Sequence, residues 1–331
     1  MPEAQTWMLY GAAGHTGALI AKHAQERGHR PLLAGRSGPP LAALAEALGL
    51  PHRVVTLEDP TALRAALADV DLVLNAAGPF VRTAAGLAEA CLDAGVHYVD
   101  IGNELQVFLT LYGLHQRAQE AQVAVVPGVG FGVVATNCLA RYVSEKVGGA
   151  ERLEVASKAA IAQQGPGAAA ARRENLPYGG WVRKSGQLLA NPLGAGVTTL
   201  PLPDGACRVM PVPTGDLEAA FHATHAPDII AYAAIADPAA LNPQASSSEA
   251  AGARAYRSFG WARATGTDGS SAQAWLETGE SYAFTVAACV HAAEETLKGA
   301  LKGAFSPAVA FGADFPLTLP GTTRVDTLGG S

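Results

Sequence analysis

The chain has 331 residues, of which 49% are hydrophobic and 16% charged, and its formal net charge is -6. That length allows two packed domains, and the acidic balance offers no basic surface for nucleic acid, which is not expected as a partner. The most apolar run, residues 124–135, is interrupted by proline and glycine and is too short to cross a bilayer, so no membrane partner is expected either.

The first 130 residues alternate short Leu-rich or β-branched runs with Ala-rich runs, which predicts a Rossmann-type doubly wound parallel sheet in an α/β protein. Strands are expected at 6–10, 30–34, 53–57, 71–76, 96–100 and 123–126. Helices are expected at 15–27, 39–49, 60–68, 83–94 and 105–121.

We place the end of this first domain at residue 133. Residues 134–331 are expected to form a second, α+β domain that carries an antiparallel sheet and serves substrate binding or dimerisation. Residues 237–255 are expected to be a loop or an irregular helical excursion. A helix over 283–303 is expected, and it could pack back on the first domain.

The turn between the first strand and the first helix contains Gly11, Gly14 and Gly17, a G-x-x-G-x-x-G spacing. Glycines let a backbone approach a diphosphate closely, and the start of a helix offers free N–H groups. The alternative is an ordinary turn, but the strand-turn-helix-strand context favours a phosphorylated dinucleotide. The residues expected to hold it are Gly11, Ala13, Gly14, His15, Thr16 and Gly17.

The second strand ends in Gly35, Arg36 and Ser37, with no acid nearby. An NAD-preferring site usually has Asp or Glu there to hold the ribose hydroxyls. Guanidinium and hydroxyl groups suit a 2′-phosphate instead, so Arg36 and Ser37 predict NADP(H). The alternative is that Arg36 is merely a solvated charge after a strand.

Ligands of an open α/β sheet bind outside the carboxyl ends of its strands, and two further loops there consist largely of small residues. One loop is expected to lie under the nicotinamide ribose, unless it is a plain strand-to-helix turn; it consists of Asn75, Ala76, Ala77, Gly78, Pro79 and Phe80. The other, residues 127–132, is expected to pack Gly128 and Phe131 against the nicotinamide, unless it is an interdomain hinge.

The fifth strand and the loop after it carry the candidate proton-transferring groups Tyr98, Asp100 and Glu104. Tyr98 and Asp100 share one side of a strand, and Glu104 is expected at the mouth of the crevice. Reduction by hydride needs an acid near the atom that gains charge, and Tyr98 is the first candidate for it. A core tyrosine and a capping aspartate are the alternative.

Other chemistries find little support. The four cysteines (Cys91, Cys138, Cys207 and Cys289) have no C-x-x-C pair and no signal peptide ahead of them, which predicts reduced, mostly buried thiols in a cytoplasmic protein. No H-x-x-x-H spacing occurs, so no metal is expected, and His222 and His225 are interpreted as surface or pocket-lining residues. The absence of a G-x-S-x-G motif argues against an acyl-enzyme.

Together these motifs resemble those of the saccharopine dehydrogenase-like NADP-binding oxidoreductases, particularly the bacterial branch that includes trans-acting enoyl reductases. The resemblance extends to residues 216–220, 310–315 and 319–322. Members of that branch often have an acid after the Gly-Phe pair and then Pro-Thr-Asp. This chain has Gly132 and then Ala135, Thr136 and Asn137. It therefore lacks both acids of the family pattern, and the family's mechanism does not carry over through this loop.

The resemblance implies an NADPH-dependent reductase that transfers hydride to a C=N, C=O or activated C=C bond. The substrate is small or tethered to a carrier, and Arg172, Arg173 and Lys184 are candidates for binding a substrate carboxylate. A homodimer formed through the second-domain sheet is also implied. A sensor that binds NADP(H) without turnover is the alternative function.

Overall fold

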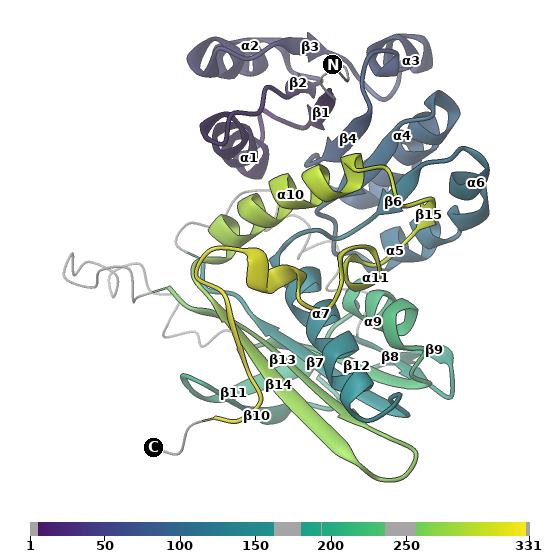
Figure 1. Cartoon of the computed structure of the whole chain (residues 1–331), viewed down its shortest axis with the longest axis vertical. Helices are drawn as coiled ribbons and strands as arrows, with labels where there is room; N and C mark the ends of the chain where they lie inside the picture. Colours follow the sequence, from purple (N-terminus) through teal and green to yellow (C-terminus); the bar gives the residue numbers. More distant parts are fainter. Residues whose placement is uncertain (1–5, 162–179, 193, 236–255, 329–331) are drawn as a thin grey trace, which may run out of the picture.

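The computed structural model describes residues 6–161, 180–192, 194–235 and 256–328. They form two sheets that lie at opposite ends of the molecule, with helices between them (Figure 1). The expected irregular segment at 237–255 lies outside the described residues. No helix in the described ranges is long and apolar enough to cross a membrane.

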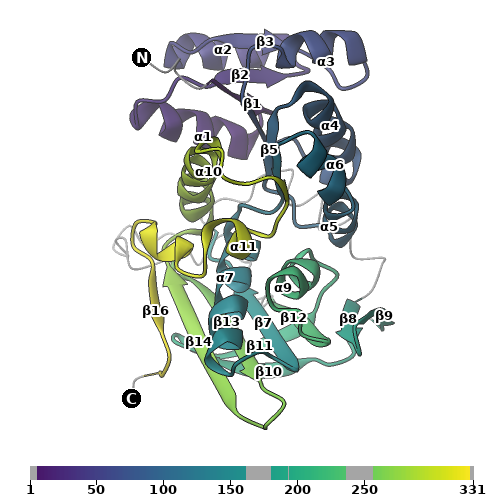
Figure 2. The same cartoon turned by 45° about the vertical axis from the view of Figure 1, so that its right-hand side comes forward.

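The first sheet has seven parallel strands in the order β15-β6-β5-β4-β1-β2-β3, which confirms the predicted Rossmann-type topology. Its strands are β1 (Trp7–Tyr10), β2 (Leu32–Gly35), β3 (His52–Val54), β4 (Leu72–Asn75), β5 (His97–Asp100), β6 (Ala124–Val126) and β15 (Gly303–Ala304). Strands β1, β4 and β6 are buried throughout, because helices cover both faces of the sheet. Figure 2 shows these layers from the side.

The helices of this part are α1 (His15–Glu26), α2 (Gly38–Leu48), α3 (Pro60–Leu67), α4 (Phe80–Ala94), α5 (Leu105–Tyr112) and α6 (His115–Glu120). The single helix expected at 105–121 is wrong, since α5 and α6 are separated at residues 113–114. The break places the imidazole of His115 against β15, where its Nδ1 lies 3.0 Å from the oxygen of Ala304. A contact with a strand so distant in the sequence leaves no local signal.

The second sheet has nine strands, with seven in the order β10-β11-β12-β7-β13-β14-β16; β8 pairs with β12 and with β9. All its pairs are antiparallel except β7 with β12. The strands are β7 (Arg152–Lys158), β8 (Gly180–Lys184), β9 (Gln187–Asn191), β10 (Thr198–Leu202), β11 (Gly205–Pro211), β12 (Asp228–Ala234), β13 (Ser258–Thr265), β14 (Ser271–Thr278) and β16 (Thr323–Val325).

The segments that connect the two sheets contain α7 (Phe131–Lys146), α10 (Ser281–Leu297), α11 (Pro307–Phe311) and a 3-10 turn (Phe315–Thr318), whereas α9 (Asp216–Thr224) joins β11 to β12 within the second sheet. Helix α7 packs on β7, β13 and β14, whereas α10 packs on α1 and near β4 and β5. The start of α7 at Phe131 was not predicted. All four cysteines are buried and free.

Candidate nucleotide-binding site

One position in the turn before α1 and one in the first turn of the helix admit only glycine. Gly11 has φ +84°, and a Cβ there would lie 2.7 Å from the amide nitrogen of Ala77. A Cβ on Gly17 would lie 2.2 Å from the carbonyl oxygen of Gly11. The turn is therefore pressed against both the loop after β4 and its own helix. Ala13, Gly14 and His15 are exposed beside it, and Thr16 is partly exposed.

The N-terminus of α1 differs from those of α4, α7 and α10. Its N-cap residue Gly14 provides no side chain, and no side-chain hydrogen bond caps the helix. In three other helices a side chain takes one of the first amides: Phe80 N donates to Glu104 (3.3 Å), Phe131 N to Thr285 (3.0 Å) and Ala283 N to Glu280 (2.9 Å). The amides and positive dipole end of α1 thus remain open to an anion.

The end of β2 offers a second set of open donors. Arg36 and Ser37 are both exposed, and within the described residues Arg36 forms no ion pair. Ser37 is the N-cap of α2, yet its hydroxyl caps no helix amide. A guanidinium and a hydroxyl beside an uncapped helix suit a phosphate monoester, so these residues fit the 2′-phosphate of NADP(H).

The loop after β4 lies directly beside the glycine turn. Asn75 is buried, and its side-chain oxygen accepts a hydrogen bond from the amide of Ala77 at 3.0 Å. The Gly78–Pro79 peptide is cis. Ala76, Ala77, Pro79 and Phe80 are partly exposed, and Gly78 is exposed. This surface is open to solvent, as the expected ribose position requires.

Tyr98 and Asp100 lie inside the protein rather than at its surface. Both are 0% exposed, and the Tyr98 hydroxyl donates to Asp100 Oδ2 at 2.9 Å while accepting from Asn75 Nδ2 at 3.1 Å. Asp100 Oδ1 accepts from the amides of Gly102 (2.9 Å) and Gly128 (3.0 Å). The network therefore fixes the loops after β4, β5 and β6, which is the core-tyrosine alternative.

Burial shifts the acidity of both groups. Desolvation raises the pKa of Asp100 to about 6, although its hydrogen bonds act in the opposite direction. Desolvation, together with the charge of Asp100, raises the pKa of Tyr98 well above its ordinary value. The Tyr98 proton is thus held strongly in the core.

Glu104 also turns inward, with 5% of its surface exposed. One carboxylate oxygen accepts from Phe80 N, and the other accepts from Asn103 N at 2.9 Å. Its backbone pairs with Thr214, from the segment before α9. Glu104 therefore braces the loops after β4 and β5 at the junction with α9, rather than standing at an open mouth.

The two residues expected under the nicotinamide are buried as well. A Cβ on Gly128 would lie 2.5 Å from Phe108, so this glycine fills a tight core position. Phe131 is 5% exposed, and its ring meets that of Phe284 edge-on at 5.5 Å. Phe131, the first residue of α7, is therefore buried against α10.

The residues that depart from the family pattern tie α7 to its neighbours. Thr136 donates to Asp216 at 2.5 Å. Asn137 donates to the carbonyl of Ala219 at 2.7 Å and accepts from the amide of Ala308 at 2.8 Å. An amide side chain can donate and accept at once, which a carboxylate cannot. These positions therefore serve packing.

The candidate carboxylate-binding residues and the histidine pair are divided between several places. Lys184 forms an ion pair with Asp228, and Arg172 and Arg173 lie outside the described residues. His222 stacks on Tyr112 with ring centroids 3.7 Å apart, and burial lowers its pKa to about 4. Among the described residues, no group of three metal-ligating side chains occurs.

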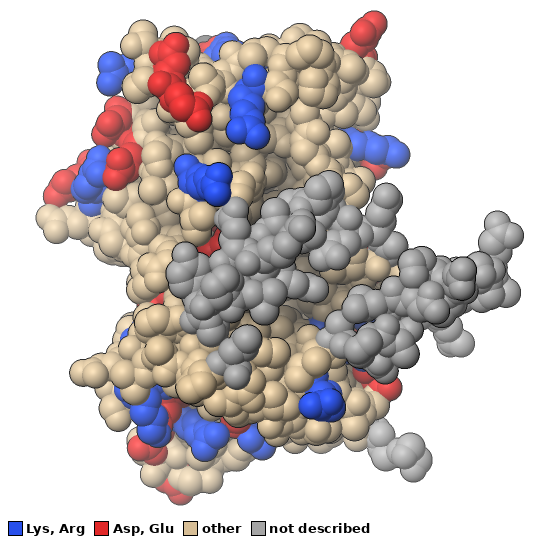
Figure 3. All heavy atoms as spheres, turned by 180° about the vertical axis from the view of Figure 1, so that it is seen from behind, with Lys and Arg blue, Asp and Glu red and all other residues tan. Residues whose placement is uncertain are grey.

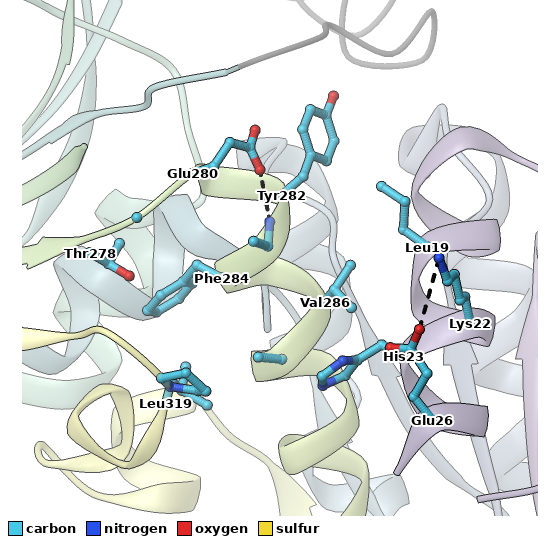
Figure 4. Close-up of a pocket in the computed structure, with 14 residues that line it drawn as sticks. Leu19, Lys22, His23, Glu26, Thr278, Glu280, Tyr282, Phe284, Val286 and Leu319 are labelled. Atoms are coloured by element: carbon cyan, nitrogen blue, oxygen red, sulfur yellow. Dashed lines mark hydrogen bonds and ion pairs between the residues drawn. The ribbon is translucent and has the colours of Figure 1, made fainter. Parts of the chain in front are cut away.

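A cleft of about 470 Å³, not foreseen from the sequence, lies between α1 and α10 (Figure 4). Its walls are mainly apolar, with Leu19 and His23 from α1 facing Val286 from α10. Figure 3 shows the charged side chains of one face, where Lys and Arg are interspersed with Asp and Glu among the coloured residues.

Comparison with known proteins agrees with this geometry. Residues 7–126 match the family model of the saccharopine dehydrogenase NADP binding domain. A trans-acting enoyl reductase from Mycobacterium bovis is 33% identical over 132 residues, which cover 38% of this chain and 32% of that protein. The counterpart from Mycobacterium ulcerans is 32% identical over 132 residues. The match thus spans about a third of the length of these curated relatives.

Among solved structures, apo saccharopine dehydrogenase (L-Glu forming) from Saccharomyces cerevisiae is similar over 97% of this chain and 100% of that chain. Its TM-score is 0.65 and its identity 13%, so the likeness is one of fold. The domain match confirms the resemblance over residues 7–126 and the cofactor NADP(H).

Proposed function

Because this chain carries a saccharopine dehydrogenase NADP-binding domain, we propose that it is an NADPH-dependent reductase. The observation that carries this proposal is the pair of open anion sites, one at the uncapped start of α1 and one at Arg36 and Ser37. When bound, NADPH supplies a hydride to a C=N, C=O or activated C=C bond of a small or carrier-tethered substrate. The enoyl reductase relatives favour a C=C bond in a tethered substrate.

We assign the chain's own residues three roles. The amides of His15, Thr16 and Gly17 bind the diphosphate, since the Gly14 amide already donates to the Gly11 carbonyl, and Arg36 with Ser37 binds the 2′-phosphate. The loop at 75–80 supports the ribose. Tyr98, Asp100 and Glu104 act as positioning residues that keep the loops after β4, β5 and β6 in register with the glycine turn.

The test is NADPH oxidation by the purified protein, followed by absorbance, with three substrate pools and with NADH in parallel. The pools are oxo acids with amines, ketones with aldehydes, and enoyl pantetheine thioesters. Turnover in the thioester pool, with NADPH preferred over NADH, is the expected result. Turnover only with free ketones would reassign the substrate, and turnover only with NADH would contradict the role of Arg36.

Binding without turnover is a second candidate function. It is favoured by the burial of all three expected proton-transferring side chains, whose polar atoms bond inside the protein. A sensor should bind NADPH tightly while no pool accelerates its oxidation. A homodimer through the second sheet belongs to the enzyme proposal, and equilibrium sedimentation that shows only monomer would remove it.

A further inference from the structure

The C-terminal part of the chain reaches the glycine turn through α10. Helices α1 and α10 run in parallel, because contacts join them at both ends. At their starts, the rings of His15 and Tyr282 meet edge-on with centroids 5.0 Å apart. At their ends, Glu294 of α10 contacts His29 at 2.8 Å and Arg27 at 3.1 Å.

His15 occupies a position that matters for anion binding. It is the first residue of α1, so its amide is one of the open donors and its side chain stands exposed at the rim of the turn. Edge-to-face ring contact gives an exposed imidazole a preferred orientation. Tyr282 therefore decides where the His15 ring lies relative to the diphosphate position.

The first turn of α10 also touches the other side of the site. Thr285 accepts a hydrogen bond from Phe131 N, and Phe284 packs edge-on against the Phe131 ring. In Figure 4, Tyr282 projects from the start of α10 on the side away from Val286, and it is one of the residues that line the cleft beside α1. One helical turn from the far end of the chain thus joins the glycine turn to the start of α7.

We propose that Tyr282 is a cofactor-positioning residue, which orients His15 so that the start of α10 forms a wall of the diphosphate subsite. This inference rests on the proposed function, since it presumes that the diphosphate lies on α1. It implies that residues 7–126 alone form an incomplete site.

The experiment compares the affinity of the full-length protein for NADPH with its affinity for adenosine 2′-monophosphate, which lacks the diphosphate. We expect Tyr282→Ala to raise the NADPH Kd about fivefold, while the adenosine 2′-monophosphate Kd changes less than about twofold. Tyr282→Phe keeps the ring and should bind NADPH like the wild type. His15→Ala and Tyr282→Ala should be non-additive in a double-mutant cycle.

The matched control is Leu19→Ala, which removes an exposed apolar side chain from the same α1–α10 cleft but away from the turn. Equal effects of Leu19→Ala and Tyr282→Ala, additive effects of His15 and Tyr282, or equal loss for both ligands would each overturn the proposal. Failure of the wild type to bind NADPH would instead defeat its premise, so the two failures are distinguishable.

Discussion

The starts of α1 and α4 stand beside each other at one edge of the same sheet, yet they are built in opposite ways. The start of α1 has no side-chain cap, and its turn exposes Gly14 and His15. At the start of α4, the carboxylate of Glu104 takes the amide of Phe80. An open helix start can bind an anion, whereas one that is closed by the protein's own carboxylate repels it. The candidate site residues that the sequence groups together therefore divide into an exposed set at the glycine turn and a buried set that braces the loops.

The largest expected effect, on both stability and NADPH affinity, comes from adding a side chain at a glycine of the turn. Gly17→Ala places a Cβ 2.2 Å from the Gly11 carbonyl oxygen, so the turn must move. We expect a loss of about 3 kcal/mol in the free energy of unfolding, from overpacking against backbone. The NADPH Kd should rise about 100-fold, as measured by fluorescence titration.

Gly86→Ala is the control for this substitution, because Gly86 lies in α4 with open space around it. It should stabilise the protein by about 0.5–1 kcal/mol through helix propensity and leave NADPH binding unchanged. Normal NADPH affinity in Gly17→Ala would contradict the assignment of the turn to the diphosphate.

The second expected effect concerns cofactor choice. Arg36→Ala should raise the Kd for NADPH about 30-fold, since a charge-assisted bond to the 2′-phosphate contributes about 2 kcal/mol. The Kd for NADH should change less than about twofold. Arg64→Ala removes another exposed charge, from α3, and serves as the control. An equal loss for both cofactors would show that Arg36 does not contact the 2′-phosphate.

The pH dependence of stability distinguishes the buried carboxyl of Asp100 from the exposed residues of the glycine turn. Burial raises the pKa of Asp100 to about 6, so the folded protein keeps this proton where the unfolded chain has lost it. The free energy of unfolding should therefore fall as pH rises from about 4 to 6, by about 2 kcal/mol relative to Asp100→Asn. Urea denaturation at pH 4.5, 5.5, 6.5 and 7.5 measures the difference. Parallel curves for the two proteins would argue against a raised pKa.

The smallest expected effect separates positioning from proton transfer. Tyr98→Phe removes the hydroxyl that joins Asn75 to Asp100, which should lower the free energy of unfolding by about 1–2 kcal/mol. NADPH affinity should stay within about twofold, and turnover should fall less than about tenfold. Tyr112→Phe is the control, because the buried Tyr112 hydroxyl has no hydrogen-bond partner among the described residues.

A fall in turnover of about a thousandfold in Tyr98→Phe, with stability and NADPH affinity unchanged, would make Tyr98 the proton donor after all. That result would require the loops after β4 and β5 to open in the complex. It would also remove the second candidate function, since a sensor has no turnover to lose.

Much of the first sheet was predictable from the sequence because its signals are local. Apolar runs such as residues 7–10 and 72–75 are strands buried on both faces, and Gly11 to Gly17 has the spacing of a phosphate-binding turn. Arg36 follows its strand directly, so the NADP(H) prediction also depended on neighbours in the chain. The second sheet was foreseen as antiparallel but without its strand order, because its central pairs join segments as distant as 152–158 and 258–265.

The sequence by itself determined the fold of the first domain and its cofactor, since a turn, a helix start and a strand end are set by adjacent residues. Only the tertiary structure decided which of the polar residues face the site. Tyr98 donates to Asp100, Glu104 accepts from the amides of Phe80 and Asn103, and Thr285 accepts from the amide of Phe131, 154 positions away. Whether a polar group faces solvent or a partner depends on packing between distant segments, and spacing along the chain carries no record of it.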